Sequence, residues 1–290
     1  MRFASLLPGL TLASGVLALV GCTQILDIRD TTDPIEVTAG SGGSGGNSTP
    51  KPGSCAGDLD YKGDDAVTID MSMITFAPPN SASAGIQVEA YKDINSFGLF
   101  RDPVFCGATD ADGKIKVHVP GGSTGFAGFL IVKGSEQETF FYYFSPPRVQ
   151  NDPPFTFLTI SNNDWSALRD QVIGLPNKPD SGQVTINALD QNDKPLAGVR
   201  FEIDIQGDGQ PFFFTSDGSP SLTAKQTDPN FAFGGFFNVP AAGGRREVRM
   251  LDATSGELLG SVNINILAGT WTTMRIKSNK PAGVTPADGG

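Results

Sequence analysis

Hydrophobic and polar residues alternate along many short segments in the first half of the chain. In the clearest segment, single polar residues separate Val67, Ile69, Met71 and Met73. Successive side chains of a β-strand point to opposite faces, so this spacing predicts a strand with one buried face. Similar segments predict seven strands, at residues 67–73, 86–91, 104–109, 114–119, 129–132, 139–144 and 155–160. Short strands at this spacing, bounded by turn residues, are typical of a β-sandwich.

A helical spacing replaces the alternation after residue 162. The apolar positions are Trp165, Leu168, Val172 and Ile173. Asn163 and Asp164 are both good N-cap residues, and Gly174 can end a helix in the left-handed conformation. We therefore predict a short helix at residues 164–173, followed by an interdomain link that ends near residue 181.

The second half of the chain repeats signals of the first half in the same order. New strands are predicted at residues 183–188 and 198–203. The matched pairs are Gly85-Ile86 with Gly198-Val199, Thr109-Asp110 with Thr227-Asp228, and Val119-Pro120 with Val239-Pro240. The members of these pairs lie at nearly constant separations, which predicts a tandem duplication of one β fold.

Two segments resemble carboxypeptidase regulatory-like domains. Residues 190–199 are similar to the first hairpin of these domains, and residues 109–122 are similar to the strand pair that closes their core. The resemblance covers about residues 66–276, and it implies a transthyretin-like sandwich of seven strands and an accessory, adhesive or scaffold role. The second unit departs from the pattern at residues 229–233 and the first at residues 81–85, so the resemblance bears on the fold more than on a ligand.

An uncharged apolar run follows Arg2 at the start of the chain. It ends in Leu19-Val20-Gly21-Cys22, which has the form of a bacterial lipobox. We predict that residues 1–21 are a lipoprotein signal peptide, and that Cys22 then carries diacylglycerol and an acyl chain such as palmitate. Thr23 occupies the position where aspartate favours inner-membrane retention in enteric bacteria, and this favours the outer membrane.

Residues 22–54 are rich in glycine, serine and proline. This composition cannot bury apolar surface, so we predict a flexible tether. A flexible chain of about 30 residues reaches roughly 30 Å, which lifts a folded body clear of the lipid head groups. Together with the leader and residues 24–28, the tether resembles surface lipoproteins of myxobacteria. This resemblance implies an envelope protein that faces the periplasm or the cell surface.

The predicted fold class is all-β, with two tandem transthyretin-like or Ig-like β-sandwiches joined by a short helix. The boundaries are residues 1–21 (signal peptide), 22–54 (tether), 55–162 (first sandwich), 163–181 (helix and link), 182–278 (second sandwich) and 279–290 (disordered tail). A chain of 290 residues is long enough for one large domain or two ordinary ones.

The net charge of −10 excludes some partners. Nucleic-acid binding needs clustered lysine and arginine, and the densest basic pair here is Arg245-Arg246. A polybasic attachment to anionic lipids is excluded for the same reason. The predicted partners are therefore the membrane, through the lipid on Cys22, and an unknown envelope protein or polysaccharide.

The chain has three cysteines. With Cys22 assigned to the lipid, Cys55 and Cys106 remain, and an even pair in an exported protein favours a disulfide. Two buried thiols, or an exposed Cys55 that awaits another partner, are the alternatives.

Residues that could support catalysis or bind a metal are sparse. His118 is the only histidine, and alternation places it on the solvated face of its strand with Lys114 and Lys116. Two acidic groups could supply oxygen ligands for calcium; they are Asp58, Asp60, Asp64, Asp65 and Asp70, and then Asp110 and Asp112. An Asp-x-Asp-Gly sequence is also favoured in a hairpin turn, which is the interpretation we adopt. We predict no cofactor, no metal and no enzymatic activity.

Aromatic residues are more abundant than one core face requires. Residues 140–144, 212–214 and 236–237 place rings on both faces of their strands. The surplus rings either pack at the junction between the two units or stack on sugars from an exposed surface. The predicted function is therefore a non-catalytic, lipid-anchored binding or scaffold protein of the cell envelope, and the alternative is a carbohydrate-binding surface module.

Overall fold

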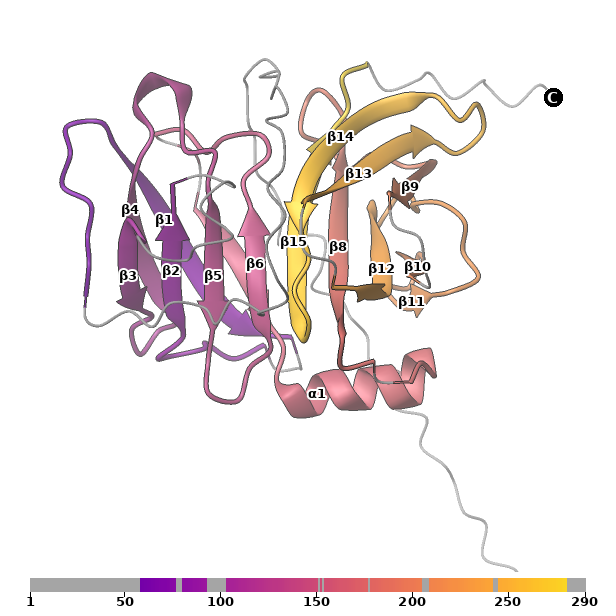
Figure 1. Cartoon of the computed structure of the whole chain (residues 1–290), viewed down its shortest axis with the longest axis horizontal. Coiled ribbons are helices and arrows are strands. Elements are labelled where there is room, and N and C mark those ends of the chain that lie inside the picture. Colours follow the sequence, from indigo (N-terminus) through magenta and orange to yellow (C-terminus); the bar gives the residue numbers. More distant parts are fainter. Residues whose placement is uncertain are drawn as a thin grey trace, which may run out of the picture.

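The computed structural model describes residues 58–76, 80–92, 103–150, 152, 154–176, 178–204, 209–241 and 245–280. Within these ranges the chain is mostly β-sheet, with one short helix between two groups of strands (Figure 1). The predicted signal peptide, the tether and most of the predicted C-terminal tail lie outside the described residues. Among the described residues, no helix combines the length and hydrophobicity needed to cross a membrane.

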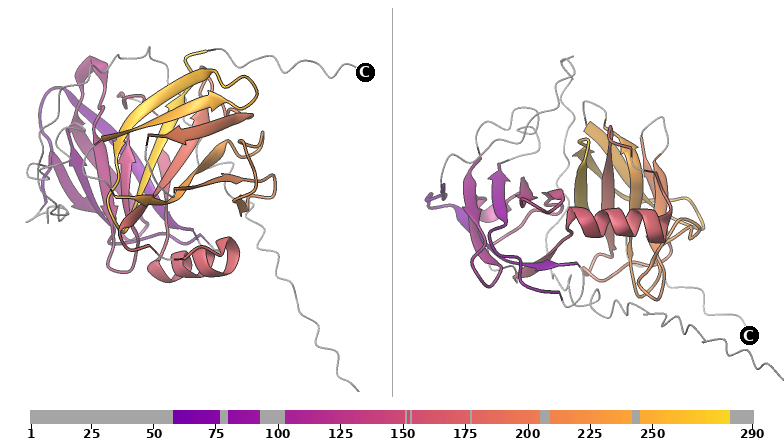
Figure 2. Two further views of the ribbon diagram at one scale, coloured as in Figure 1. Left: turned by 45° about the vertical axis from the view of Figure 1, so that its right-hand side comes forward. Right: turned by 90° about the horizontal axis from the view of Figure 1, so that it is seen from below.

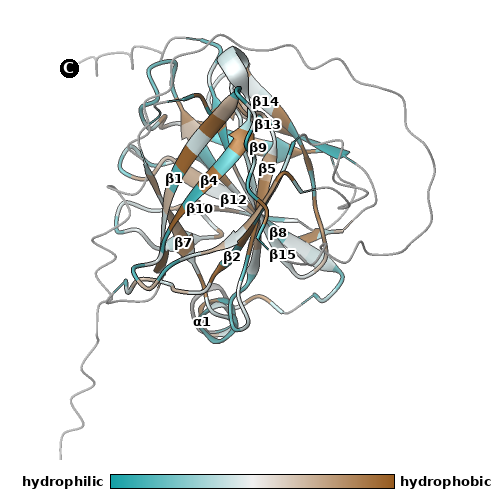
Figure 3. Ribbon diagram, turned by 90° about the vertical axis from the view of Figure 1, so that its left-hand side faces the viewer, coloured by the Kyte–Doolittle hydropathy of each residue, from teal (hydrophilic) through white to brown (hydrophobic). Residues whose placement is uncertain are grey.

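Seven strands form the first unit. They are β1 (Ala66–Thr75), β2 (Gln87–Tyr91), β3 (Phe105–Ala108), β4 (Lys114–Pro120), β5 (Phe129–Lys133), β6 (Thr139–Tyr143) and β7 (Phe155–Thr159). Their order is β4-β1-β7 in one sheet and β3-β2-β5-β6 in the other. Along β1, buried and partly exposed residues alternate as the sequence predicts (Figure 3). All seven predicted strands are confirmed, with ends that shift by a few residues.

The second unit repeats most of this strand pairing. Its strands are β8 (Ser181–Leu189), β9 (Val199–Ile203), β10 (Gln210–Phe214), β11 (Pro220–Ser221), β12 (Phe233–Pro240), β13 (Arg245–Asp252), β14 (Leu258–Asn265) and β15 (Thr270–Lys277). Strand β1 lies between antiparallel β4 and parallel β7, and β8 lies between antiparallel β12 and parallel β15. The β2-β5-β6 ladder corresponds to β9-β13-β14. Six strands of each unit thus pair alike, whereas β3 pairs with β2 and β10 pairs with β12.

A repeated hydrogen-bond pattern accompanies the repeated topology. Oγ1 of Thr109 accepts from the N–H of Ile86 at 3.0 Å, and the N–H of Thr109 donates to the carbonyl oxygen of Ile86 at 3.0 Å. Thr227 makes the same two bonds with Val199, at 3.1 and 2.9 Å. The matched Thr-Asp pairs of the sequence thus mark one structural device, in which a threonine fastens the start of a strand to a neighbouring loop.

The two units share one continuous sheet of nine strands, in the order β11-β10-β12-β8-β15-β6-β5-β2-β3. Its seam is the parallel pair β6–β15, from Thr270↔Thr139 to Met274↔Tyr143. Figure 1 shows these two strands side by side at the centre of the molecule. The units are therefore joined by strand pairing as well as by the helix and link. Pairing between segments so far apart leaves no mark in the local hydrophobic pattern.

The predicted helix is present, but it begins earlier than its predicted cap. Helix α1 (Asn162–Ala167) continues into the π-helical turn η4 (Leu168–Ile173), and Gly174 ends it with φ of 70°. The N-cap is Ser161, whose Oγ accepts from the N–H of Asp164 at 3.0 Å and donates to its carboxylate at 2.7 Å. The prediction of Asn163 or Asp164 as N-cap is thus wrong, because Ser161 offers a hydroxyl that bonds reciprocally with Asp164.

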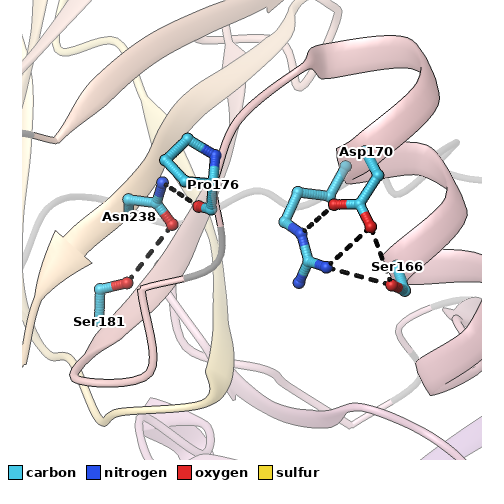
Figure 4. A network of polar contacts seen from close by, with 6 residues as sticks. Ser166, Asp170, Pro176, Ser181 and Asn238 are labelled. Carbon is cyan, nitrogen blue, oxygen red and sulfur yellow. Dashed lines mark hydrogen bonds and ion pairs between the residues drawn. The ribbon is translucent and has the colours of Figure 1, made fainter.

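Polar contacts fix the helix and the link in place. Arg169 binds Asp170 and Ser166 within the helix, and Figure 4 shows this cluster beside the contacts of Asn238. The side chain of Asn238, on β12, donates to the carbonyl oxygen of Pro176 at 3.1 Å. Figure 2 shows the helix lying across one end of the second unit's strands. The bonds of Arg169 therefore hold the helix together, and the bond of Asn238 attaches the link to the second unit.

Two hydrophobic clusters lie on opposite faces of the nine-stranded sheet. The first packs β1, β4 and β7 against the sheet and also includes Phe212, Phe237 and Trp271 of the second unit. The second lies beneath β9, β13 and β14 and also includes Phe141 and Tyr143 of the first unit. Each core is therefore built from both units.

Candidate ligand pocket between the two units

A pocket opens beside the edge strand β7. The sheet β4-β1-β7 covers one face of the nine-stranded sheet and stops at β7, which pairs with β1 and with no second strand among the described residues. Beyond that edge, the uncovered face of β15, β8, β12 and β10 lines a cavity of 260 Å³. In the second unit, the equivalent edge of β15 is occupied by β6. The cavity therefore lies where the covering sheet lacks a further strand.

The pocket wall is mainly aromatic and draws rings from both units. Its buried part includes Phe140, Phe157, Phe212, Phe237 and Trp271, while partly exposed rings line the rest. The ring centroids of Phe212 and Phe237 lie 4.0 Å apart, and those of Phe140 and Trp271 lie 5.9 Å apart. Rings stacked in this way hold one another in position, so the wall is preformed.

The aromatic residues that exceed what one core face requires are almost all buried in the structure. Residues 140–144, 212–213 and 236–237 are each at most 7% exposed, and only Phe214 of the predicted set is partly exposed. Trp165 of the helix joins them, with its ring centroid 4.7 Å from that of Trp271. Packing at the junction between the units is the interpretation that the structure confirms.

Polar groups on this wall lie along β15 and β8. Trp271, Thr273 and Arg275 share one face of β15, and all three line the pocket. Oγ1 of Thr273 is 2.9 Å from Oγ1 of Thr185, its register partner on β8. Arg275 is 3% exposed, and its Nη1 has no hydrogen-bond partner among the described residues. The indole Nε1 of Trp271 is also buried without a partner in that part of the chain.

The sequence analysis did not identify Arg275. The available signal was its period-two spacing from Trp271 and Thr273, which places a charge on the same strand face as a large ring. Nothing in the local sequence shows that this face lies at the junction of two units, so the residue reads as an ordinary solvated arginine.

The cysteine predictions are only partly within the described residues. Cys22 and Cys55 lie outside them. Cys106 is buried on β3, and its backbone exchanges two hydrogen bonds with Leu59, at 3.0 and 2.8 Å. Leu59 follows Cys55 by four positions. The Cys55–Cys106 disulfide stays a prediction, and this backbone pairing is compatible with it.

His118 has a carboxylate partner that the sequence pattern did not reveal. Its Nδ1 is 2.6 Å from Oδ1 of Asp60, and both side chains are about one-third exposed. Hydrogen bonds from Lys62 and then from His118 lower the pKa of the Asp60 carboxyl below its usual value. The histidine is thus part of a surface ion-pair cluster that ties the start of the described chain to β4, and it lies outside the pocket.

The acidic turn at Asp110 acts as a turn. Its Oδ1 accepts from the backbone N–H groups of Asp112 and Lys114, at 2.9 and 2.8 Å, and Gly113 adopts φ of 72°. These bonds confirm the turn interpretation. In the described ranges, no group of three or more His, Cys, Asp or Glu side chains is arranged to hold a metal ion.

Comparisons with known proteins give remote likenesses only. No family model matches the chain, and no curated protein matches it. The shaft pilin SpaA from Lactobacillus rhamnosus GG is similar with a TM-score of 0.24 and 10% identity, over 76% of this chain and 100% of that chain. The Bacillus anthracis TIE protein has a TM-score of 0.22 and 14% identity, over 74% of this chain and 34% of that chain. At this level of similarity the comparisons carry no argument about function.

Proposed function

We propose that this chain is a non-catalytic binding protein of the cell envelope, tethered by lipid on Cys22, that holds a small apolar ligand between its two units. The observation that carries the proposal is the 260 Å³ pocket and its preformed aromatic wall. Ligand sites are typically concave and apolar, with a few placed polar groups, and they occur preferentially at domain interfaces. This pocket has all of these properties.

The chemistry of the lining supports a role in binding. Its polar side chains are threonine, asparagine, one tyrosine and one arginine, with no carboxylate, histidine, cysteine or lysine among the residues that line it. General acid–base or nucleophilic catalysis at neutral pH usually depends on one of those groups. An apolar wall with few acceptors also suits a hydrocarbon ligand better than a sugar, whose hydroxyls need many partners.

The proposed location in the cell envelope rests on the predicted signal peptide and tether. Lipid on Cys22 of the lipobox would anchor the chain, and the Gly/Ser-rich segment would hold the folded body near the membrane. Thr23, in place of the aspartate that favours inner-membrane retention, favours the outer membrane. A binding protein on such a tether samples the space around its anchor while it keeps its ligand site on a rigid body.

Mass spectrometry of protein recovered from the native membrane under non-reducing conditions tests the predicted covalent chemistry. We expect a chain that begins at Cys22 and carries lipid there, together with a disulfide-linked peptide pair containing Cys55 and Cys106. Cys22→Ser should move the protein from the membrane to the soluble fraction or leave the leader uncleaved. An intact leader on the wild-type protein contradicts the anchor, and an unlinked Cys55 peptide contradicts the disulfide.

Blocking the pocket tests the binding proposal. The chain from residue 22 onward, made with Cys22→Ser to avoid lipid and detergent, retains every residue of both cores, which lie between Val67 and Ile276. We expect saturable binding of the neutral probes 1-octanol and indole. Thr273→Trp should weaken it about tenfold or more by filling the cavity, as followed by calorimetry.

The matched control is Thr68→Trp, at a partly exposed threonine of β1 that does not line the pocket. It should leave binding of both probes unchanged. Equal loss in the two variants, or no binding to the unmodified protein, would contradict a ligand role for the pocket.

A further inference from the structure

Arg275 is the least expected residue of the pocket. It lies on β15 near the centre of the nine-stranded sheet and is 3% exposed. Its Nη1 has no hydrogen-bond partner, and no ion pair joins it to a carboxylate in the described part of the chain. A buried guanidinium nitrogen without a partner is unfavourable, because water has been removed from it and nothing replaces that water.

Other cations that lie against or within the protein interior have a carboxylate nearby. The partly exposed Lys133 lies 2.5 Å from the fully buried carboxylate of Glu89. Arg148, 1% exposed, lies 3.4 Å from the carboxylate of Asp152 and faces the ring of Phe155. Arg275 has no such carboxylate among the described residues, and its side chain lines the cavity. Such a local departure from favourable burial is expected at a functional site.

From this departure we propose that the pocket binds an amphipathic carboxylate, with the carboxylate at Arg275 and the hydrocarbon against the aromatic wall. The inference rests on the proposed function of the pocket and names its ligand class. A guanidinium matches a carboxylate with two parallel hydrogen bonds, which are stronger than bonds between neutral groups. The ligand would thus supply the acceptors that the protein itself does not provide.

The surroundings of Arg275 fit a single negative charge. Its register partner on β8 is Asn187, so the two side chains lie side by side on the pocket face, and both line the cavity. The amide offers a further neutral donor to a carboxylate oxygen. The lining contains one formal positive charge, which a monocarboxylate balances.

The remaining wall sets the size of the ligand. A cavity of 260 Å³ lies just below the range of roughly 300–1,000 Å³ that is typical of sites for drug-sized ligands, which suggests a ligand of roughly ten non-hydrogen atoms. Octanoate has this size, and a short aryl carboxylate does too. Trp271 lies four residues before Arg275 on the same strand, so the two mark positions roughly 13 Å apart along the pocket. An extended chain of octanoate length runs along most of that distance.

The test compares head groups on one hydrocarbon chain. Octanoate, 1-octanol and octylamine are titrated into the Cys22→Ser chain from residue 22 onward, in buffer without detergent. We expect octanoate to bind about tenfold or more tightly than 1-octanol, and octylamine to bind most weakly. Octyl sulfate is the fourth probe, and binding of octyl sulfate more tightly than octanoate would overturn the carboxylate assignment in favour of a tetrahedral anion.

Arg275→Met removes the charge and keeps the length of the side chain. We expect this variant to bind octanoate no more tightly than 1-octanol, while the unliganded protein melts at the same temperature or higher because an unpaired buried charge is gone. Arg200→Met, at a partly exposed arginine of β9 that pairs with Glu202, is the control and should keep the preference for octanoate.

The outcomes separate the two proposals. If 1-octanol binds and octanoate gains nothing from Arg275, the carboxylate assignment fails while the pocket remains a ligand site. If none of the four probes binds, the proposed function fails as well. If Arg275→Met lowers the melting temperature strongly, Arg275 has a structural partner and the inference is overturned.

Discussion

Replacing Gly235 by alanine should destabilise the protein by about 4 kcal/mol or more, which is a large part of the about 5–15 kcal/mol that stabilises a typical folded domain. Gly235 lies in β12 opposite Thr185 of β8, in the middle of the second unit's half of the shared sheet. Its φ is 153°, and an added Cβ would lie 1.9 Å from the carbonyl oxygen of Val184. The backbone of β8 would have to move, and that strand carries ladders on both sides. Urea denaturation followed by circular dichroism measures the loss.

Gly269→Ala is the matched control for this prediction. Gly269 also has a positive φ, 67°, but an added Cβ would meet nothing within 4 Å. The variant should lose only about 1 kcal/mol, the cost of forcing a side chain into the left-handed region. Similar losses in the two variants would show that backbone conformation, and not the close approach to Val184, sets the requirement for glycine at position 235.

Local features of the fold are predictable from the sequence. The alternation from Val67 to Met73 predicts β1 correctly, because one face of that strand packs on a core and the other meets solvent. Thr109 and Thr227 could be matched because each fastens the start of a strand in the same way. Helix α1 is predicted in type, but its first residue is not, since the four consecutive residues 161–164 can all act as caps.

The pocket could not be predicted, because it depends on the pairing of β6 with β15. Those strands are separated by more than a hundred residues, and each reads locally as an ordinary strand. The pairing extends the sheet past the edge of β7 and leaves the face that carries Trp271 and Arg275 partly uncovered. The sequence signals a surplus of rings, and only the strand order shows that the surplus forms a wall.

The duplicated topology gives the two units different edges. β7 and β15 are equivalent strands, yet β15 pairs with β6 and β7 borders the pocket. The two units therefore have one closed edge and one open edge. The pocket is a consequence of how the units are joined.

Separating the two units should abolish folding of both. Expressed alone, residues 22–176 and residues 177–290 would each lose the β6–β15 ladder, and β6 and β15 would become edge strands with one unpaired side. Phe140 would lose its stacking on Trp271, and the hydroxyl of Tyr143 would lose the N–H of Asn265 at 3.3 Å. Each large side chain that returns to water costs about 1.5–3 kcal/mol, against a total stability of about 5–15 kcal/mol. Circular dichroism and proton NMR of each fragment measure the outcome.

Mixing the fragments is the control, because the strand pairing and both mixed cores can re-form without the covalent link. We expect the mixture to recover a single cooperative transition, whereas each fragment alone aggregates or gives the narrow spectrum of an unfolded chain. A fragment that unfolds cooperatively by itself would show that its core does not need rings from the other unit. That result would also weaken the case for the pocket, since a pocket wall shared by two independent domains would change shape as the domains move. A pocket wall on one continuous sheet, in contrast, keeps Trp271 and Arg275 at a constant separation.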